Sequence, residues 1–248
     1  MLIYGAKLVN FEQKTIDFVV NYCEMSNYLC LLANKMFGIC ARKICVENNI
    51  MVILRIMENK NNKYDENEGK WTILSSEYLF KRPWLTARRD KVQLPNGVVN
   101  DEFYVLEYPD WVNVLAITDE GKFVMIRQYR HGLGSTHFEI PAGVVEEGES
   151  PLQAAQRELL EETGFSGGEW TKLTSISANA SCTSNITHCY LAVGVESTGE
   201  QHLEATEDIS VHLLNEEMVK ILLVNDDIKQ ATMTTPLWKY FMLKALSR

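Results

Sequence analysis

Apolar residues recur at helical spacing in one segment of the chain, at Leu152, Ala155 and Leu159. Residues three or four positions apart lie on the same face of an α-helix, so this spacing predicts a helix with one apolar face. The segment follows Gly143, where a glycine turn opens, and it ends at Gly164. The pattern therefore predicts a loop followed by an amphipathic helix.

The residues at the two ends of this segment support the same prediction. Ser150 is a good N-cap, and Pro151 suits the first helical position because its missing N–H would have no partner there. Gln153 is placed to complete a capping box with Ser150. Gly164 is expected to end the helix in the left-handed conformation.

The rest of the C-terminal two thirds is rich in β-branched and aromatic residues, which favour strands. We expect tight turns at 95–97, 118–121 and 166–168, where glycine follows polar residues. Two helices are expected to close the chain, one capped by Asn215 and one following Thr235 and Pro236. Strands are expected within residues 71–108, 111–117, 122–130, 170–175 and 186–195.

Composition and charge narrow the class of protein. The formal net charge of −9 argues against a general nucleic-acid binder, which needs clustered Lys and Arg. No apolar run is long enough to span a bilayer, and the N-terminus lacks the order of a signal peptide. Four of the six cysteines lie within residues 1–56 at irregular spacing without a CxxC pair, which favours free thiols over a zinc site. We therefore expect a cytoplasmic protein.

Three glutamates share one face of the predicted helix, namely Glu158, Glu161 and Glu162. Like charges this close repel each other, so the cluster is either a solvated acidic face or a site for a divalent cation. Carboxylate oxygens on a rigid element suit Mg²⁺ or Mn²⁺. Arg157 is placed to orient a glutamate by a bidentate contact.

The spacing of the whole motif favours the cation site. Residues 143–165 read GVVEEGESPLQAAQRELLEETGF, with a glycine, a glutamate six positions later, and then Arg-Glu, Glu-Glu and Gly at fixed intervals. This pattern resembles the Nudix box of the Nudix hydrolases. The strand ending in Gln128 and Arg130, and the EIPAG segment at 139–143, are similar to the ADP-ribose pyrophosphatase branch of that family.

The resemblance implies an α/β fold, a Nudix α/β/α sandwich with a mixed sheet and an N-terminal β arm. It implies Mg-dependent hydrolysis, with Mn²⁺ as a possible substitute, of a diphosphate such as that of ADP-ribose to a nucleoside monophosphate and a sugar phosphate. The metal ligands would be Ala142 through its carbonyl, Glu158, Glu161, Glu162 and Glu207. The catalytic residues would be Glu162, Glu161, Arg157 and Glu204, and the substrate contacts would be Arg130 and Glu139.

Each substrate contact has a plainer alternative. Arg130 is either a surface cation at a strand end or a bidentate ligand of phosphate oxygens. Glu139 either caps a short strand or hydrogen-bonds substrate hydroxyls.

Two positions depart from the branch. Ala180 stands where its members tend to carry a proline, and Ala205 stands where they place the acid proposed as general base. The adjacent Glu204 is the substitute we expect for that base. These departures leave open a pyrophosphatase for a GDP-hexose or another nucleotide sugar. A sensor domain that binds without cleaving is a further alternative, although such regulators usually carry an eroded box.

Composition and the resemblance to the family together divide the chain into four segments. Residues 1–56 form an N-terminal extension of unclear status, 57–70 a polar lead-in, 71–108 the β arm and 109–248 the Nudix domain. One hypothesis is that Met57 is the translation start, and a species beginning at Met1 in an intact-mass measurement on native protein would refute it. The arm implies a homodimer. Arg82, Arg88 and Arg89 are either solvated or directed at a partner subunit's nucleotide.

Overall fold

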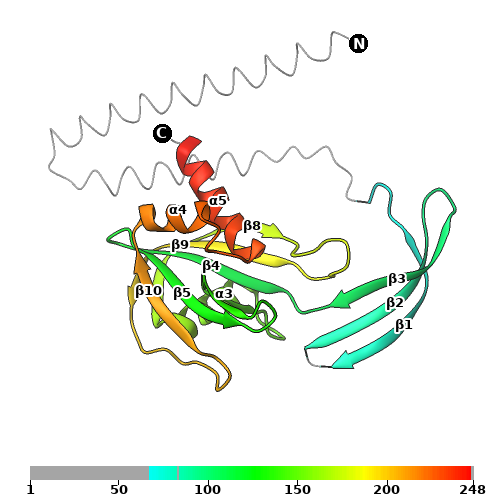
Figure 1. The fold of residues 1–248 in the computed structure, drawn as a ribbon, viewed down its shortest axis with the longest axis horizontal. Helices are drawn as coiled ribbons and strands as arrows, with labels where there is room; N and C mark the ends of the chain where they lie inside the picture. Colours follow the sequence, from blue (N-terminus) through cyan, green and yellow to red (C-terminus); the bar gives the residue numbers. More distant parts are fainter. Residues whose placement is uncertain (1–66, 83, 247–248) are drawn as a thin grey trace, which may run out of the picture. The chain divides into compact units, whose positions relative to one another are not determined.

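The computed structural model describes residues 67–82 and 84–246 (Figure 1). The extension 1–56, most of the polar lead-in, and the Met57 hypothesis lie outside the described residues. The described part holds two sheets and three helices, and β4 and β9 run parallel while the other paired strands run antiparallel. The fold is the expected mixed α/β arrangement. None of the described helices is both long and apolar enough to cross a membrane.

The first sheet is a meander of three antiparallel strands, in the order β1, β2, β3. They are β1 (Thr72–Arg82), β2 (Leu85–Gln93) and β3 (Val99–Glu107). The predicted turn at 95–97 joins β2 to β3, and Gly97 adopts a positive φ of 84° there. Arg88 pairs with Asp90 and Glu107, so this arginine is held within the sheet.

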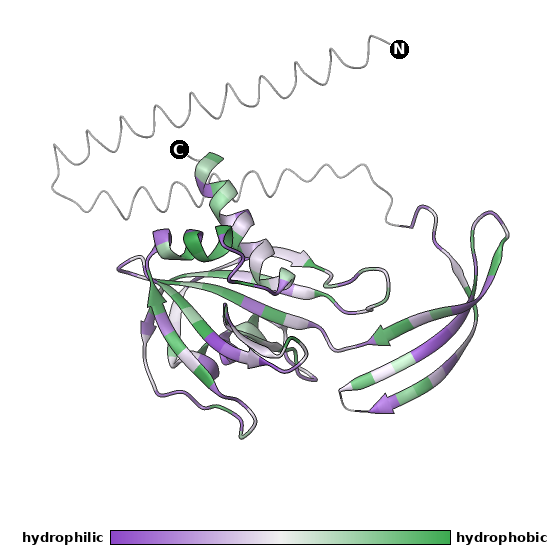
Figure 2. Cartoon of the chain, in the orientation of Figure 1, coloured by the Kyte–Doolittle hydropathy of each residue, from purple (hydrophilic) through white to green (hydrophobic). Residues whose placement is uncertain are grey.

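The second sheet has seven strands, five of them in the order β10-β5-β4-β9-β8, and two short strands pair outside this order, β6 with β5 and β7 with β4. Its strands are β4 (Trp111–Thr118), β5 (Phe123–Arg130), β6 (Ser135–Glu139), β7 (Ala142–Val144), β8 (Phe165–Ile176), β9 (Thr187–Ser197) and β10 (Ile209–Leu214). Apolar residues dominate β4 and the first half of β5, as Figure 2 shows. The predicted pairing of these two strands is confirmed.

The predicted central helix is α3 (Pro151–Thr163). Ser150 is its N-cap, Gln153 completes the capping box, and Gly164 ends it with φ 72°, all as predicted. Ala155 and Leu159 are fully buried against apolar residues of β4, and a buried leucine contributes about 1.5–3 kcal/mol. Leu152 shares this face in the first turn of the helix but is 37% exposed, so the face is fully buried only further along the helix.

Two local predictions were wrong. Residues 166–168 lie inside β8 rather than in a turn, because pairing with β9 continues from Phe165 onward. Gly167 and Gly168 take positive φ values of 79° and 75° within this strand, and a Cβ on Gly168 would lie 2.7 Å from the Val193 carbonyl oxygen. The glycines thus permit close strand pairing here instead of ending the strand.

The second error concerns the last helix. α4 (Glu216–Val224) has Asn215 as its N-cap, as predicted, but α5 (Ala231–Leu246) begins at Ala231, ahead of the expected start at Pro236, and contains that proline. Proline has no N–H to donate to the carbonyl four residues earlier, which is that of Thr232. That carbonyl instead accepts a hydrogen bond from the Asn113 side chain at 2.6 Å. The prediction started the helix at proline because a proline inside a helix leaves one carbonyl without a hydrogen bond. Here Asn113 of β4 supplies that hydrogen bond, so the helix can begin earlier.

Candidate active site

Strand β7 and the C-terminal half of helix α3 approach each other closely. A Cβ built on Gly143 would lie 2.0 Å from the Glu158 carboxylate, so only glycine leaves that side chain its position. The neighbouring Ala142 donates its backbone N–H to Glu162 at 2.8 Å. The motif glycine and the two glutamates therefore form one packed unit.

Glu162 is a buried carboxylate with 3% of its surface exposed. Burial raises the pKa of Glu162 well above its ordinary value, and the nearby Glu158 and Glu207 add to that rise. The Ala142 N–H and Arg130 act in the opposite direction. A positive charge beside this carboxylate would favour its ionised form.

Glu158 shows the same behaviour. Burial raises the pKa of Glu158, Arg157 lowers it, and the charges of Glu161 and Glu207 raise it again. The carboxylates of Glu158 and Glu162 are thus shielded from water, and the neighbouring acidic side chains outnumber the neighbouring arginines. This is the electrostatic setting in which a bound cation stabilises the charged form.

Arg157 holds the acidic residues of the motif in place. Its guanidinium donates to Glu149 at 2.7 and 3.3 Å, to Glu158 at 2.8 Å and to Glu161 at 2.9 Å. A further bond at 2.9 Å reaches the Val144 carbonyl on β7. The bond to Glu149 is the largest cause that raises the pKa of Arg157. One planar fork therefore joins the loop, the helix and the strand.

The loop before β10 brings one of the two predicted acids to the helix. The Glu207 carboxylate accepts the backbone N–H of Glu204 at 3.0 Å, and its charge acts on Glu158, Glu162 and Arg130. Glu204 itself is exposed, and the Glu207 N–H returns a bond to its carbonyl at 3.0 Å. Glu207 lies where a metal ligand is expected, whereas Glu204 is tied to the site through its backbone.

Arg130 and Glu139 form a bidentate ion pair across β5 and β6. The two bonds are 2.9 and 2.5 Å long, and Glu139 is only 1% exposed. The bond to Glu139 is the largest cause that raises the pKa of Arg130, whose guanidinium also feels Glu162 and Glu207. The structure therefore holds the Arg130 guanidinium against Glu139, close enough to Glu162 and Glu207 for their charges to act on it.

The donor set fits a divalent cation. The side-chain donors converging here are carboxylate oxygens, which suit hard cations, and the pKa values of two of them are raised by burial and mutual repulsion. In the described part of the chain no group of three or more His, Cys, Asp or Glu side chains is already arranged as a metal cage. Glu161 is turned to Arg157 and Glu162 to the Ala142 N–H, so both carboxylates would exchange these bonds for a cation.

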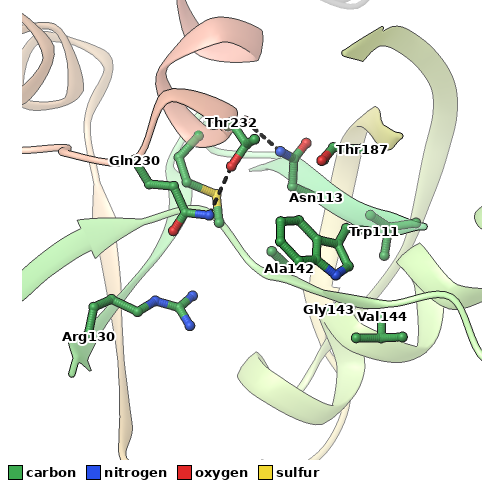
Figure 3. Close-up of a pocket in the computed structure, with 11 residues that line it drawn as sticks. Trp111, Asn113, Arg130, Ala142, Gly143, Val144, Thr187, Gln230 and Thr232 are labelled. Atoms are coloured by element: carbon green, nitrogen blue, oxygen red, sulfur yellow. Dashed lines mark hydrogen bonds between the residues drawn. The ribbon is translucent and has the colours of Figure 1, made fainter. Parts of the chain in front are cut away.

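A cavity of about 180 Å³ adjoins this cluster (Figure 3). Arg130, Ala142 and Gly143 line one side, and Asn113 and Thr187 line another. Sequence reasoning missed the last two residues, because a polar residue within an apolar strand has no signature of its own until its neighbours are known.

Comparisons with known proteins agree with this geometry. The family model of the NUDIX domain matches residues 107–233, and that of the nucleoside diphosphate sugar hydrolase N-terminal domain matches residues 71–106. The ADP-ribose pyrophosphatase of Bacillus subtilis is 37% identical over 141 residues, which cover 57% of this chain and 75% of the relative.

A second relative and a solved structure point the same way. The ADP-ribose pyrophosphatase of Mycobacterium tuberculosis is 34% identical over 144 residues, covering 56% of this chain and 69% of the relative. The crystal structure of an ADP compounds hydrolase superposes with a TM-score of 0.63 at 25% identity, covering 72% of this chain and 97% of that one. The chain therefore belongs to the Nudix hydrolase family, within its ADP-ribose pyrophosphatase-like branch.

Proposed function

We propose that this protein hydrolyses the diphosphate of ADP-ribose or a related nucleotide sugar. A P–O bond of the P–O–P bridge breaks, the oxygen of water bonds to the attacked phosphorus, and the products are a nucleoside monophosphate and a sugar phosphate. The observation that carries the proposal is that the charge of Arg130 acts on the buried Glu162 of α3 and on Glu207. A cation-binding acidic cluster beside a fixed guanidinium suits a diphosphate.

The protein's residues take distinct roles in this proposal. Arg130 binds phosphate oxygens, and Glu139 holds its guanidinium in the required plane. Arg157 holds the carboxylates of Glu158 and Glu161 in position through hydrogen bonds. Glu204, on its exposed loop, accepts the proton of the attacking water. Glu139 takes a positioning role through Arg130, and its predicted contact with substrate hydroxyls stays a prediction.

The proposed cofactor is Mg²⁺, with Mn²⁺ able to replace it. Glu158, Glu161, Glu162, Glu207 and the Ala142 carbonyl would hold it. When bound, such cations neutralise charge that develops on phosphate oxygens and make water more acidic.

The proposal is tested by measuring phosphate release from ADP-ribose, GDP-mannose, UDP-glucose and NADH with a coupled phosphatase. We expect Mg²⁺-dependent turnover, highest for ADP-ribose, that EDTA abolishes and added Mg²⁺ restores. A preference for GDP-mannose would select the GDP-hexose alternative. Tight binding of one compound by calorimetry, without turnover of any, would instead identify a ligand sensor.

The three-stranded sheet is the surface we propose for homodimer formation. All of β1 is exposed, and the sheet and its loops present large apolar side chains to solvent. In Figure 2 these alternate with polar residues along the strands. The exposed apolar residues are Trp71, Ile73, Leu74, Tyr78, Leu79, Phe80, Trp84, Leu85, Val98, Val99 and Tyr104.

Exposed apolar side chains at this density are typical of protein interfaces. We expect light scattering coupled to size-exclusion chromatography to give twice the monomer mass for the full chain. Replacing Phe80 and Tyr78, both more than half exposed, with serine is expected to shift the mass towards the monomer. A monomeric wild-type protein at micromolar concentration would contradict the dimer.

A further inference from the structure

We propose that the cavity lined by Asn113 and Thr187 is a subsite for a hydroxyl-bearing sugar ring of the substrate, next to its diphosphate. The inference rests on the proposed function and adds the part of the substrate that this chain recognises there. Four observations carry it: the face of the sheet, two buried oxygens without partners, the fixed orientation of the Asn113 amide, and the size of the cavity.

The strand register places the lining residues on one face. Asn113 pairs with Ala142 on β7, while Trp111 pairs with Val144 on β7 and with Thr187 on β9. Side chains two residues apart along a strand share a face, so these side chains lie together. Their face is opposite to that of Val112 and Val114, which pack against α3. Arg130 and Ala142, which belong to the phosphate end of the site, line the same cavity.

Two residues that line this cavity each carry a buried side-chain oxygen that has no hydrogen-bond partner among the described residues. These oxygens are Oδ1 of Asn113, a residue that is 0% exposed, and Oγ1 of Thr187, which is 3% exposed. Both residues line the cavity, and Figure 3 shows their side-chain oxygens next to each other. A buried oxygen without a hydrogen-bond partner lowers the free energy of unfolding, so a ligand that donates hydrogen bonds to these two atoms would remove that cost.

The orientation of the Asn113 amide follows from the fold. Its Nδ2 donates to the Thr232 carbonyl at 2.6 Å, and a carbonyl oxygen only accepts, so the amide nitrogen must face α5. Pro236 leaves that carbonyl without its helical partner. The amide oxygen is therefore the atom left for a ligand. Gln230 donates to the Thr232 hydroxyl at 3.0 Å, which fixes the adjoining wall.

Size and shape select the ligand. Pockets that enclose a drug-sized ligand measure about 300–1,000 Å³, so a cavity of about 180 Å³ takes one ring and not a whole nucleotide sugar. Arg130 at its edge would bind phosphate, and the group joined directly to a phosphate in such substrates is a sugar. Sugar hydroxyls donate to Asn113 Oδ1 and Thr187 Oγ1, while the half-buried Trp111 ring offers an apolar wall.

The sugar has two sources, the ribose of the nucleoside and the distal sugar. The test uses Thr187→Val, which keeps the β-branched shape and removes only the hydroxyl, together with Thr187→Ser, which keeps the hydroxyl. Thr174→Val on β8, outside the cavity, is the matched control. Calorimetry at equilibrium with Ca²⁺ present measures Kd for ADP-ribose, AMP and ribose 5-phosphate, and phosphate release measures turnover separately.

We expect Thr187→Val to raise the Kd for ADP-ribose about three- to tenfold, the size of one net hydrogen bond, with Thr187→Ser and Thr174→Val within about twofold of wild type. If Thr187→Val weakens the binding of ribose 5-phosphate but not of AMP, the subsite holds the distal sugar. If it weakens the binding of AMP but not of ribose 5-phosphate, the subsite holds the nucleoside ribose. Unchanged Kd values for all three compounds in Thr187→Val would overturn the subsite and leave the two oxygens to water. Wild-type protein that binds ADP-ribose without hydrolysing it would refute the proposed reaction while the Kd comparison still decides the subsite.

Discussion

Replacing Glu162 with glutamine is expected to lower kcat for ADP-ribose hydrolysis by about 10³-fold. Glutamine has nearly the same shape, and its amide oxygen still accepts the Ala142 N–H that Glu162 accepts at 2.8 Å. The change therefore removes the negative charge and little else. Because burial already disfavours that charge, we expect thermal unfolding without metal to occur at the same or a higher temperature.

The matched control is Glu169→Gln, the same chemical change at an exposed position of β8. It is expected to keep kcat within about twofold, as surface substitutions usually do. Both variants are assayed for phosphate release with saturating Mg²⁺, beside a thermal unfolding curve. A Glu162→Gln enzyme that retains more than about a tenth of wild-type kcat would remove Glu162 from the metal-binding and catalytic set.

Arg157→Lys is expected to lower kcat/KM by about 10- to 100-fold and to lower the free energy of unfolding by about 1–2 kcal/mol. Lysine keeps the positive charge but cannot form the planar fork that joins Glu149, Glu158 and Glu161 to the Val144 carbonyl. Glu158 and Glu161 would then be free to adopt other rotamers. The stability loss is kept modest because a quarter of the Arg157 side chain is still exposed, at 26%.

Arg127→Lys is the control for this change, because Arg127 is exposed on β5 and contacts the Phe138 ring. Kinetics over a range of Mg²⁺ concentrations and chemical denaturation are measured on both variants. We expect Arg157→Lys to need more Mg²⁺ for half-maximal rate and Arg127→Lys to need the same amount as wild type. Equal Mg²⁺ requirements in the two variants would show that the fork does not position the glutamates for metal.

Much of the local structure could be predicted from residues close in sequence. The caps of α3 at Ser150 and Gly164 follow from a few adjacent side chains, as does the turn that joins β2 to β3. The clustering of Glu158, Glu161 and Glu162 follows from helix geometry alone. The metal and substrate roles assigned to individual residues remain predictions that the variants above would test.

The local errors share one cause. Gly167 and Gly168 were expected to turn the chain, and Pro236 was expected to begin a helix, because each residue favours that role in isolation. In the folded protein β9 pairs with the strand through both glycines, and Asn113 satisfies the carbonyl that Pro236 leaves free. Contacts from distant segments outweighed local preference.

The sequence by itself determined the element types and the acidic motif, because both depend on spacings of a few residues. Tertiary structure decided which partners those residues meet. It brought Glu207 to the α3 glutamates, paired Glu139 with Arg130, and joined Asn113 to a carbonyl 119 residues away. Such contacts depend on how strands and helices pack in three dimensions, and that packing cannot be read from the spacing of residues along the chain.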